Sequence, residues 1–359
     1  MAEPGDDWFD ELSELIVAIE EPAVFCALAH SHRLSPLVAR YDLVHKLPDN
    51  WHPGIVDSFW ESWYANEIRV GELVDEALRI SERLSQKYAI TFTKGIVCQA
   101  SLYGDVGLRK MSDIDLLVPA ANQGGIRVDL VDAGYSERMV YRRRVGGLVP
   151  RDRADLLKYA VSPDHLPHFV RVAEQRGAMC RAFVLDVAFS LSWHNAKWKL
   201  TPDIIDDAGD KLEVQGLLAE GAIPALSPVN NFIFLCMHFF REAWFDSNAL
   251  RLPQIADIVR CWVRISVDDR KLLKHRIASL GIGGPIGWAA YHIDEMFDIG
   301  LVHALSLSDF IADEWVASAV NKGRDVCRWH GDMRTRVIEG CVGELSSSPG
   351  VPFSSECLG

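Results

Sequence analysis

The stretch of sequence that decides the fold runs from Lys94 to Val118 and reads KGIVCQASLYGDVGLRKMSDIDLLV. Its last seven residues, SDIDLLV, predict a buried strand, because a short apolar run bounded by a turn residue is typical of one. Residues two apart on a strand point to the same face, so Asp113 and Asp115 are expected side by side, with Ile114 facing the core. Such a carboxylate pair suits Mg²⁺, which takes oxygen ligands and keeps room for phosphates. Two solvated acids at the end of a strand are the alternative interpretation.

The other end of this stretch carries Lys94 and Gly95, between a predicted strand at 89–93 and a predicted helix at 96–103. A glycine at such a junction lets a phosphate approach the backbone closely, and the N-terminus of a helix favours an anion. Lys94 adds a positive charge. The pair therefore predicts a phosphate-binding corner.

Arg109 stands four residues before Asp113. A guanidinium beside a metal site can bind a phosphate through two parallel hydrogen bonds. The alternative is an ion pair between Arg109 and either Asp113 or Asp105.

A third carboxylate, Asp186, lies inside the apolar segment 182–189, which predicts another strand. A carboxylate among apolar neighbours is costly unless it is paired or metal-bound. Asp186 is therefore a candidate third metal ligand, or a general base that takes a proton from an acceptor hydroxyl. A structural acid paired with an arginine is the alternative. The sequence assigns no role to three nearby or downstream histidines, His165, His168 and His238.

Hydrophobic periodicity divides the chain into four regions and predicts an α+β protein. Residues 1–88 are expected to form an N-terminal helical segment, and 89–200 a core with a small mixed sheet that includes a hairpin over 136–149. Residues 201–345 are expected to form a helical C-terminal domain, and 346–359 a disordered tail. The main C-terminal helices are predicted at 228–245, 252–265, 268–280 and 286–297.

Composition limits the classes of function. The 359 residues carry a formal net charge of −13, so the chain is a poor candidate for a protein that coats nucleic acid. Its longest apolar runs are too short to cross a membrane, and its acidic start lacks the order of a secretory signal. The eight cysteines form no C-x-x-C pair, which favours reduced thiols in a cytoplasmic protein.

Residues 94–118 resemble the uncharacterised bacterial nucleotidyltransferase family of the DNA polymerase beta-like superfamily. The family's Lys-Gly before a helix, its Leu-Tyr, its Arg and its Asp-Ile-Asp-Leu-Leu-Val occur here in the same order. The similarity spans roughly residues 25–265. It continues in further segments at His32–Val38, Leu185–Val187, Phe234–His238, Arg251–Leu252 and Asp257–Ile258.

The resemblance implies a nucleotidyltransferase core that uses Mg²⁺ to transfer a nucleoside monophosphate from a nucleoside triphosphate, such as ATP, to an acceptor, which we expect to be a small molecule. Asp113 and Asp115 would hold the metal, with Asp186 as a possible third ligand. Lys94, Gly95 and Arg109 would hold the phosphates.

The sequence departs from the family pattern at two places. The superfamily's Gly-Ser dipeptide is absent, because Gly95 precedes Ile96 and Gly104 precedes Asp105. The His-Trp that often follows the strand aspartate is absent as well. Two alternatives therefore stay open: a catalytically silent nucleotide-binding or regulatory protein with the same fold, and an enzyme that moves only a terminal phosphate.

Overall fold

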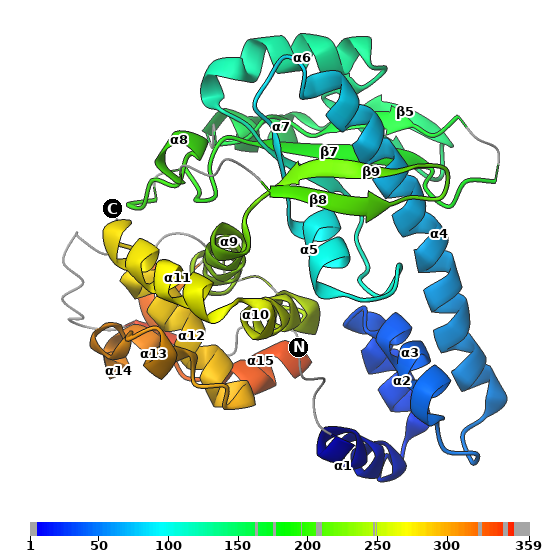
Figure 1. Ribbon diagram of the computed structural model, residues 1–359, viewed down its shortest axis with the longest axis vertical. Helices are drawn as coiled ribbons and strands as arrows, with labels where there is room; N and C mark the ends of the chain where they lie inside the picture. Colours follow the sequence, from blue (N-terminus) through cyan, green and yellow to red (C-terminus); the bar gives the residue numbers. More distant parts are fainter. Residues whose placement is uncertain are drawn as a thin grey trace.

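The computed structural model describes residues 6–161, 164–174, 177–194, 196–205, 210–246, 248, 250–321, 325–339 and 344–347. In this part of the chain, helical regions come before and after the segment that forms most of a mixed sheet (Figure 1). This agrees with the predicted mixture of α and β structure. The predicted tail at 346–359 lies outside the described residues, except for Ser346 and Ser347, which belong to a short strand.

The N-terminal region is helical, as predicted. Its helices are α1 (Asp6–Val17), α2 (Pro22–Ser31), α3 (Ser35–His45) and α4 (Pro53–Leu84). The first part of α4 packs against α2 and α3 in a small core around Phe59, whereas its second part packs its apolar side on the sheet. Helix α4 therefore connects the N-terminal helices to the sheet, as Figure 1 shows.

The main sheet has the strand order β3-β6-β7-β2-β1-β9-β8. Strand β2 is parallel to β7 and antiparallel to β1, and β1 is parallel to β9. The strands are β1 (Thr91–Thr93), β2 (Ile114–Leu117), β3 (Ser136–Glu137), β6 (Phe169–Val172), β7 (Ala182–Ala188), β8 (Asp210–Gln215) and β9 (Glu220–Ala225). The mixed character predicted for the sheet is confirmed.

The predicted hairpin at 136–149 is present in its main part as a separate ribbon. Strands β4 (Met139–Arg142) and β5 (Gly147–Pro150) pair antiparallel. Residues 143–146 form the turn, and Gly146 ends it with a φ of 68°, a value that favours glycine. Ser136 and Glu137 belong instead to β3, which pairs with β6 in the main sheet.

The prediction that the chain is helical after residue 200 is wrong for residues 210–225. Strands β8 and β9 form an antiparallel hairpin there and join the main sheet beside β1. Only three residues of this segment are buried, namely Val214, Ile223 and Ala225, so its pattern of buried positions is short. A second difference is a small sheet of β10 (Ser318–Asn321), β11 (Asp325–Trp329) and β12 (Leu345–Ser347).

The predicted C-terminal helices are present with small shifts of their ends. They are α9 (Pro228–Phe240), continued by a π-helical turn over Arg241–Phe245, then α10 (Leu252–Arg264), α11 (Val267–Ser279) and α12 (Gly283–Phe297). The remaining helices are α5 (Lys94–Leu102), α6 (Gln123–Asp132), α7 (Arg153–Val161), α8 (Pro202–Ile205), α13 (Leu301–Ala304), α14 (Asp313–Val316) and α15 (Met333–Glu339), with 3₁₀ turns at Ala120–Asn122 and Ser308–Phe310.

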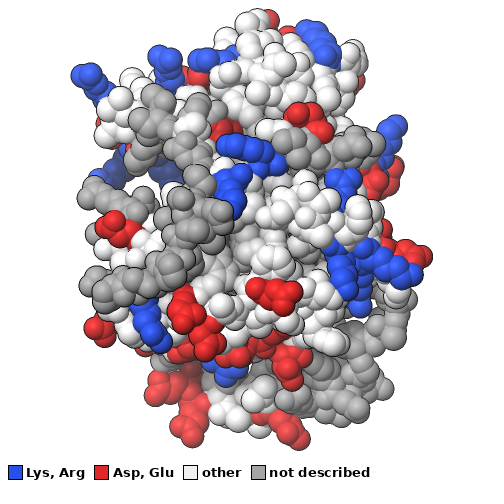
Figure 2. Space-filling view, turned by 90° about the vertical axis from the view of Figure 1, so that its left-hand side faces the viewer, with Lys and Arg blue, Asp and Glu red and all other residues white. Residues whose placement is uncertain are grey.

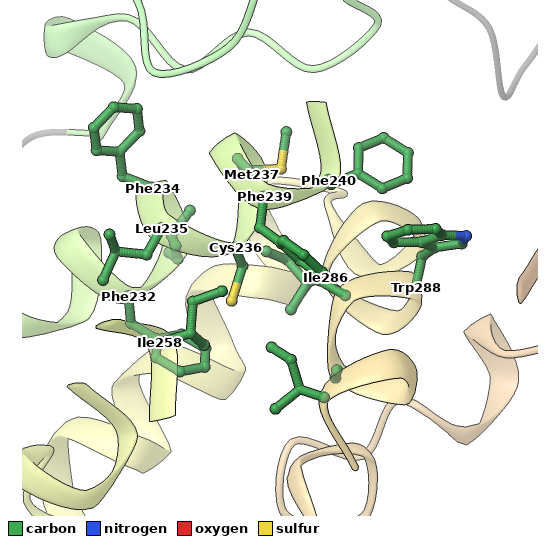
Figure 3. Packing of buried hydrophobic residues seen from close by; sticks show 14 of the residues in the cluster. Phe232, Phe234, Leu235, Cys236, Met237, Phe239, Phe240, Ile258, Ile286 and Trp288 are labelled. Carbon is green, nitrogen blue, oxygen red and sulfur yellow. The ribbon is translucent and has the colours of Figure 1, made fainter. Parts of the chain in front are cut away.

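Helix α9 is the centre of the C-terminal core. Almost every side chain on it is buried, and Figure 3 shows Phe232 near Ile258 of α10, with Ile286 and Trp288 of α12 on the other side. A helix that is apolar around its whole circumference must be enclosed by neighbouring elements. The α9 segment thus fixes the C-terminal helices relative to the sheet, because Leu102 of α5 and Leu117 of β2 belong to the same core.

Candidate active site

Strand pairing places two of the three predicted carboxylates opposite each other. Asp115 of β2 is the register partner of Asp186 on the parallel strand β7, and Thr93 of β1 is its partner on the other side. Ile114 and Leu116 point into the core between the sheet and α4, so Asp115 points to the opposite face, as the alternation of a strand requires. The sequence alone could not show that Asp186 is the neighbour of Asp115.

Lys94 lies between these two carboxylates. Its Nζ is 2.7 Å from Oδ1 of Asp115 and 3.8 Å from Oδ2 of Asp186. The residue opens α5 with a φ of 49°, a left-handed conformation that costs free energy in a residue other than glycine. Although burial opposes its charge, Asp115 and Asp186 raise the pKa of Lys94 above its ordinary value. Lys94 is therefore the internal cation of the site.

Asp113 lies just outside the strand, which begins at Ile114 rather than at the predicted Ser112. Its side chain is half-buried and borders the same cavity as Asp115. Burial, together with the charges of Asp113 and Asp186, raises the pKa of Asp115 to about 7 even though Lys94 opposes that shift. Burial is the larger cause of this shift, and the nearby Asp113 and Asp186 add to it, so the site disfavours the charged form of Asp115.

Asp186 has one oxygen without a partner. Its Oδ1 is buried and accepts no hydrogen bond, and Nε2 of His168 lies 3.7 Å from it. Burial would raise the pKa of Asp186, but Lys94 and His168 hold it below its ordinary value, so the group is a carboxylate at neutral pH. Burial lowers the pKa of His168, which leaves its ring neutral. His168 is a site neighbour to which sequence reasoning assigned no role.

The other two histidines line different cavities. His165 pairs with Asp164 through Nδ1 at 3.1 Å, and its ring packs on Tyr159. His238 of α9 borders the cavity beside Lys94, and burial lowers its pKa well below the ordinary value, so that it is neutral.

Arg109 borders the cavity, but its guanidinium is held by Asp257 of α10. Its Nη2 and Nε donate to Asp257 Oδ2 at 2.7 and 2.9 Å, and the Tyr103 hydroxyl donates to the other oxygen at 2.9 Å. The partner is thus neither Asp113 nor Asp105, the two acids that the sequence offered; Asp105 instead pairs with Arg40. The phosphate-binding role of Arg109 stays a prediction.

Gly95 is buried in the wall of the cavity. An added Cβ would come within 3.2 Å of the Met111 side chain and 3.4 Å of Nη1 of Arg109. The glycine therefore lets α5 approach the segment that leads to β2. Whether it also faces a phosphate stays a prediction.

The cavity in front of Asp113 and Asp115 has a volume of about 400 Å³. Besides the acids, cationic side chains from three separate segments line it, namely Arg33, Lys110 and Arg251. None of the three was a predicted site residue. A signal for two of them was nevertheless present, because Arg33 and Arg251 lie in segments that carry the family resemblance.

The residues present fit a magnesium ion. Asp115 and Asp186 both reach one ammonium group, and Asp186 Oδ1 is a buried acceptor without a donor. Within the described residues, no group of three or more His, Cys, Asp or Glu side chains forms a complete metal cage. Mg²⁺ does not need one, because it is usually bound by one or two carboxylates together with substrate phosphates and water.

The surface charge is uneven. In Figure 2, acidic side chains gather mainly in the lower half of the face, and Lys and Arg mainly above them. The net charge of −13 therefore does not exclude local binding of anions. No helix in the described part of the chain is long and apolar enough to cross a bilayer.

A mixed sheet that brings carboxylates and a lysine together beside a cation-lined cavity defines a protein of mixed α and β structure with a candidate site for a metal and an anion. The chain belongs to the family described as uncharacterised nucleotidyltransferase, which it matches over residues 20–298. No curated protein matches the chain. The family description suggests nucleotidyl transfer.

Proposed function

We propose that the protein transfers a nucleoside monophosphate from a nucleoside triphosphate to a hydroxyl group of an acceptor, with Mg²⁺ held by Asp113 and Asp115. The observation that carries the proposal is the register of Asp115 opposite Asp186, with Lys94 between them. This register supports a shared cation site next to a free carboxylate oxygen. The family match and the resemblance to polymerase beta-like enzymes support the same reaction.

The chemistry divides between the two strands. In the transfer, the acceptor oxygen bonds to the α-phosphorus, the bond from that phosphorus to the bridging oxygen breaks, and pyrophosphate leaves. Asp186, whose side chain is partly exposed, accepts the proton of the acceptor hydroxyl. Bound Mg²⁺ would neutralise charge on the α-phosphate and on the leaving pyrophosphate. Once the metal displaces it from Asp115, Lys94 adds a second positive charge beside Asp186.

The position of the cavity suggests where each of the two substrates binds. The triphosphate would occupy the side of Asp113 and Asp115, where the cavity lies. The acceptor would approach Asp186 from the side of His168. We propose a small acceptor, because it has to reach a partly buried carboxylate. A nucleic-acid acceptor fits the net charge of −13 poorly.

A second candidate function is nucleotide binding without turnover. The observation that favours it is the ion pair between Lys94 and Asp115, which already neutralises one of the two proposed metal ligands. In that case Lys94 would stay on Asp115 and the protein would bind a triphosphate without cleaving it.

The decisive experiment is a screen of the four nucleoside triphosphates with Mg²⁺ against a metabolite extract, read by mass spectrometry. Nucleotidyl transfer adds a nucleoside monophosphate to the acceptor and releases pyrophosphate, whereas transfer of a terminal phosphate adds one phosphate only. Asp113→Asn and Asp115→Asn should each abolish the adduct, and Asp132→Asn, an exposed acid on α6, should not. Triphosphate binding with no adduct in any extract would favour the silent protein.

A further inference from the structure

Three cationic side chains meet in the cavity from segments that lie far apart in the sequence. Arg33 follows α2, Lys110 precedes β2, and Arg251 immediately precedes α10. All three line the cavity that Asp113 and Asp115 also line. The fold therefore concentrates positive charge directly beside the carboxylate pair.

In the described part of the chain, no acid lies close enough to these cations to form a salt bridge with them. Among the described residues, neither Arg33 nor Lys110 nor Arg251 forms an ion pair, whereas Arg109 in the same cavity is paired with Asp257. Burial and the charge of Arg251 lower the pKa of Arg33, with Asp113 opposing the shift. Burial and the charge of Arg33 lower the pKa of Lys110. The cations thus repel one another, and a bound polyanion would relieve that repulsion.

The backbone around the cavity also bears on anion binding. Arg33 has a φ of 63°, so the turn between α2 and α3 holds this arginine in a strained left-handed conformation. Pro253 and Gln254, in the first turn of α10, also line the cavity, so the positive end of a 13-residue helix opens onto it. The N-terminus of α10 therefore favours an anion here besides the side-chain charges.

We infer that Arg33, Lys110 and Arg251 form the polyphosphate-binding surface of this protein and hold the β- and γ-phosphates of the triphosphate. This inference rests on the proposed function and names the residues that bind its first substrate. It assigns a different role to Arg109, whose guanidinium is committed to Asp257 and shapes the wall of the cavity. The three cations account for a phosphate site in a chain that lacks the Gly-Ser dipeptide.

The test uses inorganic tripolyphosphate, which carries the charges of the proposed ligand without base or ribose. Its binding to the full-length protein is measured by calorimetry with and without Mg²⁺. Arg33→Ala, Lys110→Ala and Arg251→Ala should each weaken binding by roughly 10- to 150-fold, the effect of losing one charged hydrogen bond. Arg251→Glu should weaken it further than Arg251→Ala because it adds repulsion. Arg83→Ala, which removes an exposed arginine of α4 outside the cavity, is the matched control and should bind as the wild type does.

The outcomes separate this inference from the proposed function. If the variants lose tripolyphosphate and the wild type still forms no adduct with any acceptor, the phosphate site stands and nucleotidyl transfer fails. If the wild type transfers a nucleotide but the three alanine variants bind tripolyphosphate unchanged, the phosphate site is overturned and the reaction stands. Equal loss in Arg83→Ala would show a general charge effect and would also overturn the site.

Discussion

Asp115 and Asp186 are register partners on the parallel strands β2 and β7, and one lysine, Lys94, reaches both carboxylates. Side chains of register partners on adjacent strands share one face of the sheet. Two residues that are 71 positions apart in the sequence therefore form a single site. Their chemical roles can differ, because of the two only Asp186 has a buried oxygen without a hydrogen-bond donor.

Asp186→Asn tests the division of work between the two strands. The amide cannot accept the proton of an acceptor hydroxyl, so turnover should fall by about 10²- to 10⁴-fold while triphosphate affinity is nearly kept. Single-turnover kinetics and calorimetry measure the two quantities separately. A variant that loses stability but transfers nucleotide at the wild-type rate would make Asp186 a structural acid.

Lys94→Met tests whether Lys94 and the metal compete for the same carboxylates. Without Mg²⁺ the variant should be less stable than the wild type by about 3 kcal/mol, because a buried ion pair loses one partner. Added Mg²⁺ should raise its melting temperature more than that of the wild type, in which the metal has to displace the ammonium group from Asp115. Lys87→Met, which removes an exposed lysine paired with Asp129, is the control. Equal Mg²⁺ responses in all three proteins would remove the metal from this position.

Arg109→Ala distinguishes a structural arginine from a phosphate ligand. Its loss leaves Asp257 buried without its guanidinium, so the free energy of unfolding should drop by about 3 kcal/mol in urea titrations. Asp257→Asn should cost a similar amount, and the double variant should cost less than the sum of the two, because the residues form one pair. Unchanged stability together with weakened triphosphate binding would restore the phosphate role that the sequence predicts for Arg109.

We expect Glu76→Gln to change the pH dependence of the free energy of unfolding. Glu76 of α4 is buried and accepts hydrogen bonds from Arg79, Arg171 and Tyr135. Burial would raise its pKa, but these donors hold it below the ordinary value of 4.5. A depressed carboxyl pKa contributes stability above the unfolded-state value, and that contribution is lost as the pH falls through the folded-state value.

The wild type should therefore lose stability more steeply than Glu76→Gln below about pH 4.5, and the two curves should converge in acid. Thermal melts between pH 7 and pH 2 measure this difference. Parallel curves over the whole range would show that Glu76 does not titrate with folding.

Local patterns predicted the elements that carry the site. The segment ending in DIDLLV predicts β2, and the apolar run around Asp186 predicts β7. The helix predicted after Gly95 is present and begins at Lys94. These predictions succeeded because each element has its own strong pattern over a few residues. The same patterns could not show which strands are neighbours, since pairing depends on contacts between distant segments.

The cations were harder to predict for the same reason. Arg33 and Arg251 lie 218 residues apart and meet only because α2 and α10 both approach the cavity. The short distance in sequence between Arg109 and Asp113 favours Arg109 as a phosphate ligand. The buried Asp257 that binds it comes from a helix whose packing no local pattern reveals. Strands β8 and β9 escaped prediction because few of their residues are buried.

The pairing of β1 with β9 has a practical consequence for anyone who wants to isolate the site. Strand β1 has three residues and touches β9 through the register pair Phe92 and Ala225. A recombinant fragment that stops at residue 200 would strip away that neighbour and expose an unpaired strand rich in hydrogen-bonding groups beside buried apolar side chains. Such a fragment should aggregate edge to edge, so the smallest piece worth expressing has to continue at least through the β8–β9 hairpin and the helix that follows it.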